Sequence, residues 1–224
     1  MLNDKRIRII IGHYGSGKTE FAVNYAVKLA ESKKNIALAD LDIVNPYFRS
    51  REKQEMLERL GIKVIASAIG KSLGSDLPAV SASVLGPIQD ETCDVVLDVG
   101  GDAVGARALA RYKAYFAEGN YDMFCVINAN RPGTQDLEGA LEHIAAIERV
   151  VGVKVTGLVN NTHMLRETTI EDVLRGQELV KQVSQHKGIP IKYVSTLERL
   201  IPDLPKDMEG ETFSIEMYMR EDWM

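Results

Sequence analysis

The sequence is poor in cysteine, in aromatic side chains and in long apolar runs. Among 224 residues it holds 2 cysteines, Cys93 and Cys125. Both lie in or beside segments expected to be buried strands, so we interpret them as small core side chains, not as a disulfide or a metal site. No stretch approaches the length of a membrane span, and the N-terminus MLNDKR has no signal-peptide pattern. We therefore expect a cytoplasmic protein.

Positive charge is also scarce. Lys and Arg number 27 against 32 Asp and Glu, which gives a formal net charge of −5. This balance provides no general attraction to nucleic acid or to an anionic membrane, so we expect neither as a partner. The hydrophobic content of 45% is enough for a sizeable core, and the length suits one α/β domain.

What the sequence does contain is a phosphate-binding loop. Residues 12–19 read GHYGSGKT and match the pattern G-x-x-x-x-G-K-[ST]. The loop follows the apolar run Ile7–Ile11 and precedes the helix-forming segment Thr19–Glu31. A chance match is the alternative, because the pattern is permissive. The order of strand, loop and helix is what the motif requires, and it favours a genuine nucleotide site.

The residues of this loop have distinct expected roles. Its glycines let backbone N–H groups turn toward anionic oxygens at the positive end of the helix dipole. Lys18 would reach the β- and γ-phosphates, and the Thr19 hydroxyl would ligate Mg²⁺. The residues expected to contact the nucleotide here are Gly12, His13, Tyr14, Gly15, Ser16, Gly17, Lys18, Thr19 and Glu20.

Strands and helices are predicted to alternate along the rest of the chain. The expected strands are 6–11, 35–39, 63–66, 94–99, 123–128, 154–159 and 191–194. The expected helices are 19–31, 45–60, 104–117, 134–150 and 168–186. Asn45 with Pro46 is typical of a helix start, and Thr168 with Glu171 fits a capping box. The segment Ile69–Asp90 gives no clear assignment.

This alternation predicts an α/β fold with a mostly parallel central sheet and helices on both faces, a three-layer α/β/α arrangement. Ligands of such folds gather at the carboxyl ends of the strands. We expect residues 1–205 to form the nucleotide-binding domain. Residues 206–224 would be a tail that packs on the same domain or contacts a partner.

Two aspartates follow the second expected strand at this edge. In the segment ADLDIVNP, Asp40 and Asp42 lie two positions apart. Both would point to one face if the chain is still extended there, and they would diverge if it has begun to turn. One carboxylate would hold a water of the Mg²⁺ shell, and the other would orient the water that attacks the γ-phosphate. The alternative is a turn or N-cap role, for which aspartate is common.

A third aspartate closes the segment VVLDVGGD. Asp98 ends an apolar strand and fits the Walker B role, in which a carboxylate holds Mg²⁺ through water. Gly101 would bring a backbone N–H to the γ-phosphate and sense its presence. A carboxylate that only caps a turn is the alternative here as well.

The segments GHYGSGKT, ADLDIVNP and VVLDVGGD together resemble the P-loop NTPases of the SIMIBI class, in particular the MinD/ParA and cobyrinic acid a,c-diamide synthase group. The likeness spans residues 7–205. The resemblance implies ATP binding, Mg²⁺, slow hydrolysis and often a homodimer that sandwiches nucleotide. Under it, Lys18, Asp40 and Asp42 are the candidate catalytic residues, and Thr19, Asp42 and Asp98 are the candidate metal site.

One position departs from the pattern of this group. Many of its ATPases carry a lysine directly after the first loop glycine, which reaches the nucleotide of the partner subunit. Here that residue is His13. His13 could take the place of this lysine, because nearby phosphate would favour the charged form of its imidazole. The alternative is that His13 is a tolerated loop residue without a role at the phosphate.

The base contact is expected from later loops. No NKxD motif occurs, which counts against a guanine site. In the resembling ATPases an asparagine after the strand that corresponds to 154–159 contacts adenine, so Asn160 or Asn161 is the candidate. Either could instead cap the following turn. The segment Ser195–Pro205 would form the other wall of the base pocket. The alternating apolar residues of the C-terminal FSIEMYM suggest an edge strand or a partner contact.

Three functions fit these residues. The first is an ATPase whose nucleotide state switches its conformation or dimerisation for a protein client. The second is a small-molecule kinase or an ATP-dependent ligase of the dethiobiotin or cobyrinate synthetase type, with Ile69–Gly86 and Val104–Arg111 forming an acceptor pocket. The third, a GTP-dependent metal-insertion chaperone, is weakened by the missing NKxD and by the absence of closely spaced Cys or His. Lys71, Arg107 and Arg111 are weaker candidates for stabilising transferred charge.

Overall fold

An eight-stranded sheet runs through the computed structural model, which describes residues 3–42, 53–66 and 81–219. Its strand order is β3-β2-β4-β1-β5-β6-β7-β8, and every neighbouring pair is parallel. The strands are β1 (Ile7–Ile11), β2 (Ile36–Asp40), β3 (Ile62–Ala66), β4 (Asp94–Asp98), β5 (Tyr121–Ile127), β6 (Gly157–Asn160), β7 (Ile191–Leu197) and β8 (Glu211–Ile215). The prediction of a parallel sheet is confirmed.

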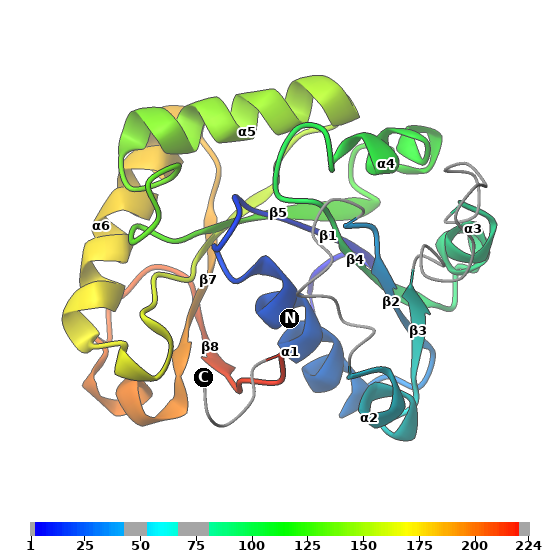
Figure 1. Cartoon of the computed structure of the whole chain (residues 1–224), viewed down its shortest axis with the longest axis horizontal. Helices are drawn as coiled ribbons and strands as arrows, with labels where there is room; N and C mark the ends of the chain where they lie inside the picture. The colour runs from blue at the N-terminus through cyan, green and yellow to red at the C-terminus, as the bar shows by residue number, and fades with distance from the viewer. Residues whose placement is uncertain (1–2, 43–52, 67–80, 220–224) are drawn as a thin grey trace, which may run out of the picture.

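Helices cover both faces of this sheet (Figure 1). On one face lie α1 (Lys18–Ala30) and α2 (Gln54–Arg59). On the other lie α3 (Ser81–Gln89), α4 (Arg107–Ala110), α5 (Leu137–Val151) and α6 (Ile170–Lys187). The short 3₁₀ helices are η2 (Lys113–Tyr115), η3 (Leu165–Glu167) and η4 (Glu198–Asp203). The three-layer arrangement is as expected from the sequence.

The apolar side chains of strand β1 pack against the helices on both faces of the sheet. Successive side chains of a strand point to opposite faces. Ile9 and Ile11 accordingly pack in the core under α5 and α6, while Ile10 packs in the core under α1. The whole strand is buried, which explains why its sequence is continuously apolar rather than alternating.

Several predicted boundaries are wrong. The helix expected over 104–117 is only the short α4 followed by η2. Its start is delayed by a turn in which Asp102 Oδ1 accepts the Gly105 N–H and the Gly105 and Gly100 backbones touch. The unassigned segment 69–90 contains α3 in its described part. The helix start at Asn45 lies outside the described residues.

The predicted capping box of α6 is one residue too early. Thr169, not Thr168, is the N-cap, and it exchanges hydrogen bonds with Asp172, not Glu171. The Thr168 hydroxyl instead accepts the Met164 N–H and donates to the Leu165 carbonyl of the preceding turn. The sequence offers two adjacent threonines with acidic partners, and only the path of the chain out of η3 decides between them.

The carboxyl-terminal part of the chain extends the sheet. Strand β7 continues to Leu197, three residues beyond the predicted end. Residues 195–203, most of the segment predicted to form a wall of the base pocket, are therefore strand and the 3₁₀ helix η4. Strand β8 pairs with β7 at the sheet edge, as the alternating apolar pattern suggested.

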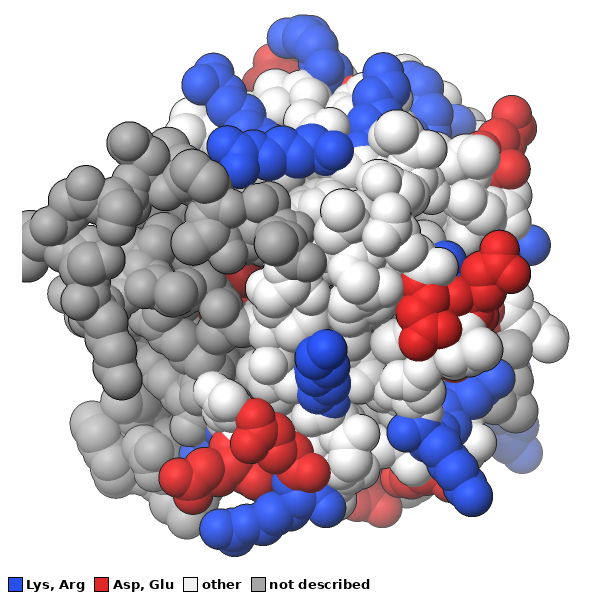
Figure 2. All heavy atoms as spheres, turned by 90° about the vertical axis from the view of Figure 1, so that its right-hand side faces the viewer, with Lys and Arg blue, Asp and Glu red and all other residues white. Residues whose placement is uncertain are grey.

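The surface beside α2 and α3 carries charges of both signs. Figure 2 shows Lys and Arg side chains in small groups, with Asp and Glu between them, on the described part of this face. None of the helices in the described ranges is both long enough and apolar enough to cross a membrane.

Candidate functional site

The phosphate-binding loop connects β1 to α1 at the carboxyl edge of the sheet. Gly15 and Gly17 have φ angles of 78° and 81°, in the left-handed region that favours glycine. Ser16 N–H donates to the His13 carbonyl at 3.0 Å and closes the loop. Lys18 and Thr19 are the first residues of α1, so the free N–H groups of its first turn lie at this loop. This geometry is that of an anion site.

Gly101 lies against the same loop. A Cβ at this residue would be 3.0 Å from the Tyr14 backbone N and 3.1 Å from the Gly12 carbonyl oxygen. The segment after β4 therefore touches the loop backbone to backbone. Gly101 therefore lies next to the loop, and its role as a sensor of the γ-phosphate stays a prediction.

Lys18 and Asp42 form a buried ion pair at the loop. Lys18 Nζ lies 3.2 Å from Asp42 Oδ2, and both side chains are less than a tenth exposed. Asp40 does a different job. Its Oδ1 accepts the Asp42 N–H at 3.0 Å, just where β2 ends and the chain turns. The two aspartates therefore diverge, the second of the two geometries considered from the sequence.

Asp98 is the last residue of β4 and lies beside Asp40 on β2 and Ile10 on β1. It is completely buried. Burial raises the pKa of its carboxyl to about 6, although the nearby Lys18 charge acts in the opposite direction. Within the part of the chain that the structure describes, the Thr19 hydroxyl lies near enough to lower this pKa, but neither Asp98 oxygen makes a hydrogen bond of good geometry. A buried carboxylate in this state is costly unless a cation or a donor from a ligand approaches it.

The side chains present fit a hydrated Mg²⁺ ion more closely than a protein-only metal cage. The described residues contain no group of three or more His, Cys, Asp or Glu placed to hold a metal. Mg²⁺ keeps several waters and takes phosphate oxygens as ligands, so one hydroxyl and one nearby carboxylate suffice. Thr19 and Asp98, whose side chains lie close to each other, would supply that donor set.

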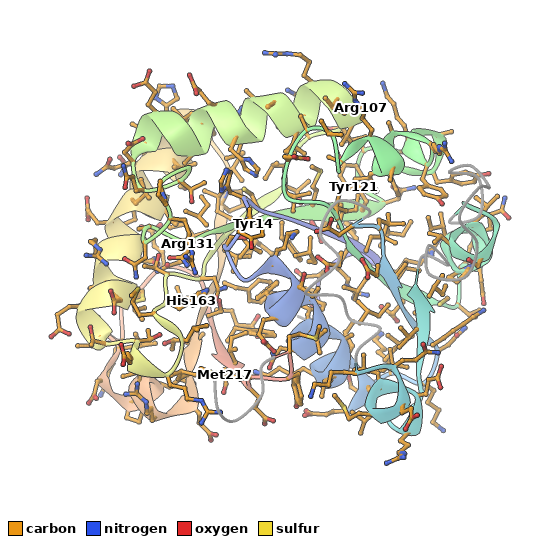
Figure 3. All side chains as sticks on the ribbon, viewed as in Figure 1. Tyr14, Arg107, Tyr121, Arg131, His163 and Met217 are labelled. Carbon is orange, nitrogen blue, oxygen red and sulfur yellow. The ribbon has the colours of Figure 1, made fainter. Side chains whose placement is uncertain are left out.

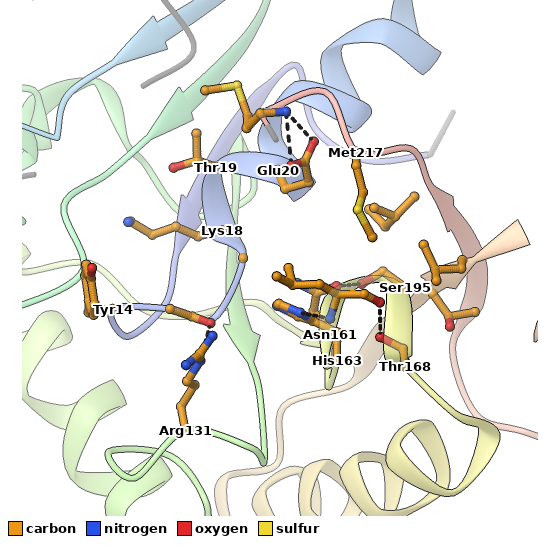
Figure 4. Close-up of a pocket in the computed structure, with 17 residues that line it drawn as sticks. Tyr14, Lys18, Thr19, Glu20, Arg131, Asn161, His163, Thr168, Ser195 and Met217 are labelled. Carbon is orange, nitrogen blue, oxygen red and sulfur yellow. Dashed lines mark hydrogen bonds between the residues drawn. The ribbon is translucent and has the colours of Figure 1, made fainter. Parts of the chain in front are cut away.

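A pocket opens beside the loop (Figure 4). Its walls come from five places: the loop with the first turn of α1, the segment after β5, the segment after β6, the end of β7, and the end of β8 with the segment that follows it. Of the residues expected at the nucleotide, those that line the pocket are Tyr14, Gly15, Gly17, Lys18, Thr19, Glu20 and Asn161. Ser195, Thr196 and Leu197 line it too, where the sequence predicted a wall.

The two candidate asparagines have separate positions. Asn161 lines the pocket, donates from Nδ2 to the Ser16 carbonyl at 2.7 Å and accepts from Ser195 Oγ at 2.7 Å. Asn160 is not a lining residue. Its Nδ2 donates to the Val173 carbonyl and to Gln177 Oε1 on α6, at 2.9 and 3.1 Å. Only Asn161 thus lies where a base could touch it.

His13 packs against its own chain. Its ring contacts the His143 ring of α5 edge to face, with centroids 5.6 Å apart, and its Nδ1 lies 3.2 Å from the Tyr14 carbonyl oxygen. Burial, with the nearby His13 and Lys18, lowers the pKa of His143 to about 4, so this imidazole is neutral at pH 7. Both readings of His13 made from the sequence stay open.

Some pocket residues were missed from the sequence. Arg131 follows β5, lines the pocket and donates from Nε to the Gly15 carbonyl at 3.0 Å. Figure 3 shows Tyr14, Arg131, His163 and Met217 following one another past the start of α1, and Arg107 apart from them on α4. The rule that found Asp98, polar residues after a buried strand, would have found Arg131 as well. Lys71 lies outside the described residues.

Comparisons with known proteins agree with this fold. The family described as CobQ/CobB/MinD/ParA nucleotide binding domain matches residues 7–196. No curated protein matches the chain.

Solved structures of FtsY are similar in fold. FtsY from Thermotoga maritima shares 23% identity with a TM-score of 0.59, over 88% of this chain and 63% of that one. Chloroplast FtsY from Physcomitrella patens shares 18% identity with a TM-score of 0.55, over 86% of this chain and 59% of that one. FtsY from Elizabethkingia anophelis in complex with GDP shares 20% identity with a TM-score of 0.54, over 84% of this chain and 56% of that one. The chain thus spans less than two thirds of these proteins.

Proposed function

Because the chain belongs to the CobQ/CobB/MinD/ParA nucleotide-binding domain family, a family of P-loop NTPases, we propose that it binds ATP with Mg²⁺ and hydrolyses it slowly. Its nucleotide state would switch its conformation or its dimerisation for a client. The observation that carries the proposal is Asp98, fully buried without a hydrogen bond of good geometry among the described residues, and close enough to Thr19, Lys18 and Asp42 for them to influence its pKa.

Each residue has a role in this proposal. Lys18 binds the β- and γ-phosphates, and phosphate oxygens then compete with Asp42 for its ammonium group. Asp42, released from Lys18, orients the attacking water, while Asp40 holds the turn that positions Asp42. Thr19 and Asp98 would hold a hydrated Mg²⁺ ion, which would neutralise charge on the phosphate oxygens. Gly101 reads the γ-phosphate through its backbone N–H.

The pocket supports adenine over guanine. Guanine presents two donors on its pairing edge, N1–H and the 2-amino group, which a carboxylate accepts well. Among the described lining residues the carboxylate is that of Glu20, and it accepts backbone N–H groups of Tyr218 and Met219. One similar structure holds GDP, so GTP is the competitor to measure.

The switch is tested by phosphate release together with light scattering after size exclusion. We expect slow ATP hydrolysis, faster than that of GTP, and a different oligomeric state in ADP from that in a non-hydrolysable ATP analogue. Lys18→Ala should abolish binding and turnover. Identical states in both nucleotides would contradict the switch. A rate that rises sharply with one small metabolite would favour the kinase or ligase function instead.

A further inference from the structure

The segment after β8 lines the pocket beside the phosphate-binding loop, although it lies about 200 residues from the loop in the sequence. It also lies beyond residues 7–196, which the family model matches. We infer that Glu216–Met219 is a strap that closes the base subsite, that Met217 packs on the face of the base, and that Glu20 and Asn24 hold the strap in place. The inference rests on the proposed function, because it takes a nucleotide as the ligand.

Asn24 binds the strap as a neighbouring strand would. Its Nδ2 donates to the Glu216 carbonyl and its Oδ1 accepts the Glu216 N–H, both at 2.8 Å. The Asn24 side chain is almost fully buried. This paired contact fixes both the position and the direction of the chain as it leaves β8.

Glu20 holds the next turn of the strap. Its Oε1 accepts the Tyr218 N–H at 2.6 Å. Its Oε2 accepts the Met219 N–H at 3.2 Å, a contact that Figure 4 shows. Glu20 and Asn24 are four residues apart, on one side of α1. Because Glu20 directly follows Lys18 and Thr19, the turn that meets the phosphates also carries the strap.

The strap brings apolar side chains to the pocket. Met217 and Met219 line it, and Figure 4 shows the Met217 side chain extending toward Ser195 and His163. A flexible, polarizable thioether packs well on an aromatic ring. Thr196 also lines the pocket, at 5% exposure, and its Oγ1 has no partner within the described ranges. The pocket thus offers a face contact and an edge hydrogen bond, which is what a purine base requires.

If Met217 contacts the base, a change at Met217 should alter the affinity only of ligands that carry a base. We compare the affinities of ATP and of inorganic tripolyphosphate, each with Mg²⁺, for the wild type and for Met217→Ala. The variant should bind ATP about three- to tenfold more weakly, the range expected for a lost sulfur–aromatic contact. Its affinity for tripolyphosphate should not change. Met164→Ala, a methionine on the surface that does not line the pocket, is the matched control and should bind both ligands like the wild type.

Hydrogen exchange gives a second readout that needs no variant. The amides of Tyr218 and Met219 should exchange more slowly with ATP than with tripolyphosphate. Equal ATP affinity in Met217→Ala and wild type, or equal exchange with both ligands, would overturn the strap while leaving the proposed function intact. A wild type that binds neither ligand would refute the proposed function itself, and the strap with it.

Discussion

At the scale of single residues, the buried carboxyl of Asp98 makes the stability of the folded chain depend on pH. Its carboxyl has a pKa of 3.8 when exposed and about 6 in the folded chain, because burial disfavours the charged form. The folded state therefore binds this proton more tightly than the unfolded state does. Stability falls as pH rises between about 4 and 6, and above pH 6 the whole penalty is present. A cation bound beside Asp98 would remove that penalty.

Asp98→Asn should therefore stabilise the nucleotide-free protein at pH 7. The gain is at most roughly 3 kcal/mol, or several degrees in Tm, because asparagine has no charge to bury. The gain should shrink toward pH 4, and the variant should lose the tightening of nucleotide binding by Mg²⁺. Thermal unfolding from pH 4 to pH 8 measures this. Asp207→Asn, at an exposed aspartate, is the control. A shift in Tm that is the same at every pH would contradict the account of Asp98.

Residue patterns predicted the phosphate loop and Asp98 as parts of the site, but they could not distinguish the roles of two candidate residues that lie close together in the sequence. Asp40 and Asp42 diverge because β2 ends at Asp40, and strand ends are set by pairing with β3 and β4. Asn160 and Asn161 differ for the same reason, since β6 ends at Asn160. Met217 was seen as part of an apolar pattern, but its place in the pocket depends on contacts with α1 far away in the sequence.

At the scale of elements, the contact between α6 and the end of β6 positions the asparagines. Gly176 lies in the interior of α6, where its sequence suggests a weak point in the helix. A Cβ there would be 2.0 Å from Thr162 Oγ1 and 2.4 Å from Asn160 Oδ1. The glycine is therefore needed for close packing. Periodicity predicted both elements, but the distance between them was not readable from the sequence.

Gly176→Ala should destabilise the protein although alanine is the better helix former by about 1 kcal/mol. We expect a net loss of about 1–3 kcal/mol in the free energy of unfolding, because the methyl group overpacks a filled site. Urea unfolding gives the value. Glu178→Ala, at an exposed position of the same helix, should change it by less than about 0.5 kcal/mol. Gly176→Ala behaving like Glu178→Ala would mean that α6 does not lie this close to β6.

At the scale of the whole molecule, the strand order assembles the site. Strand β1 lies between β4 and β5, and β2 lies on the far side of β4. The chain moves in one direction from β1 to β2 and crosses to the other side of β1 from β4 to β5, which creates a crevice at the carboxyl ends of the strands. The loop after β1, Asp42 after β2, Asp98 on β4 and Arg131 after β5 meet there. The sequence predicted the alternation of elements, whereas the position of each strand in the sheet was not predicted, because it depends on contacts between segments far apart in the chain.

The most direct test is a calorimetric titration of a non-hydrolysable ATP analogue, with and without Mg²⁺, into the wild type and into Lys18→Met/Asp42→Asn. Removing one charge alone would leave the other buried and cost about 3–5 kcal/mol, so the double variant removes both and should stay folded. We predict one analogue bound per wild-type chain, more tightly with Mg²⁺, and no binding by the folded double variant. A wild type that does not bind, or a double variant that binds as tightly, would contradict the account.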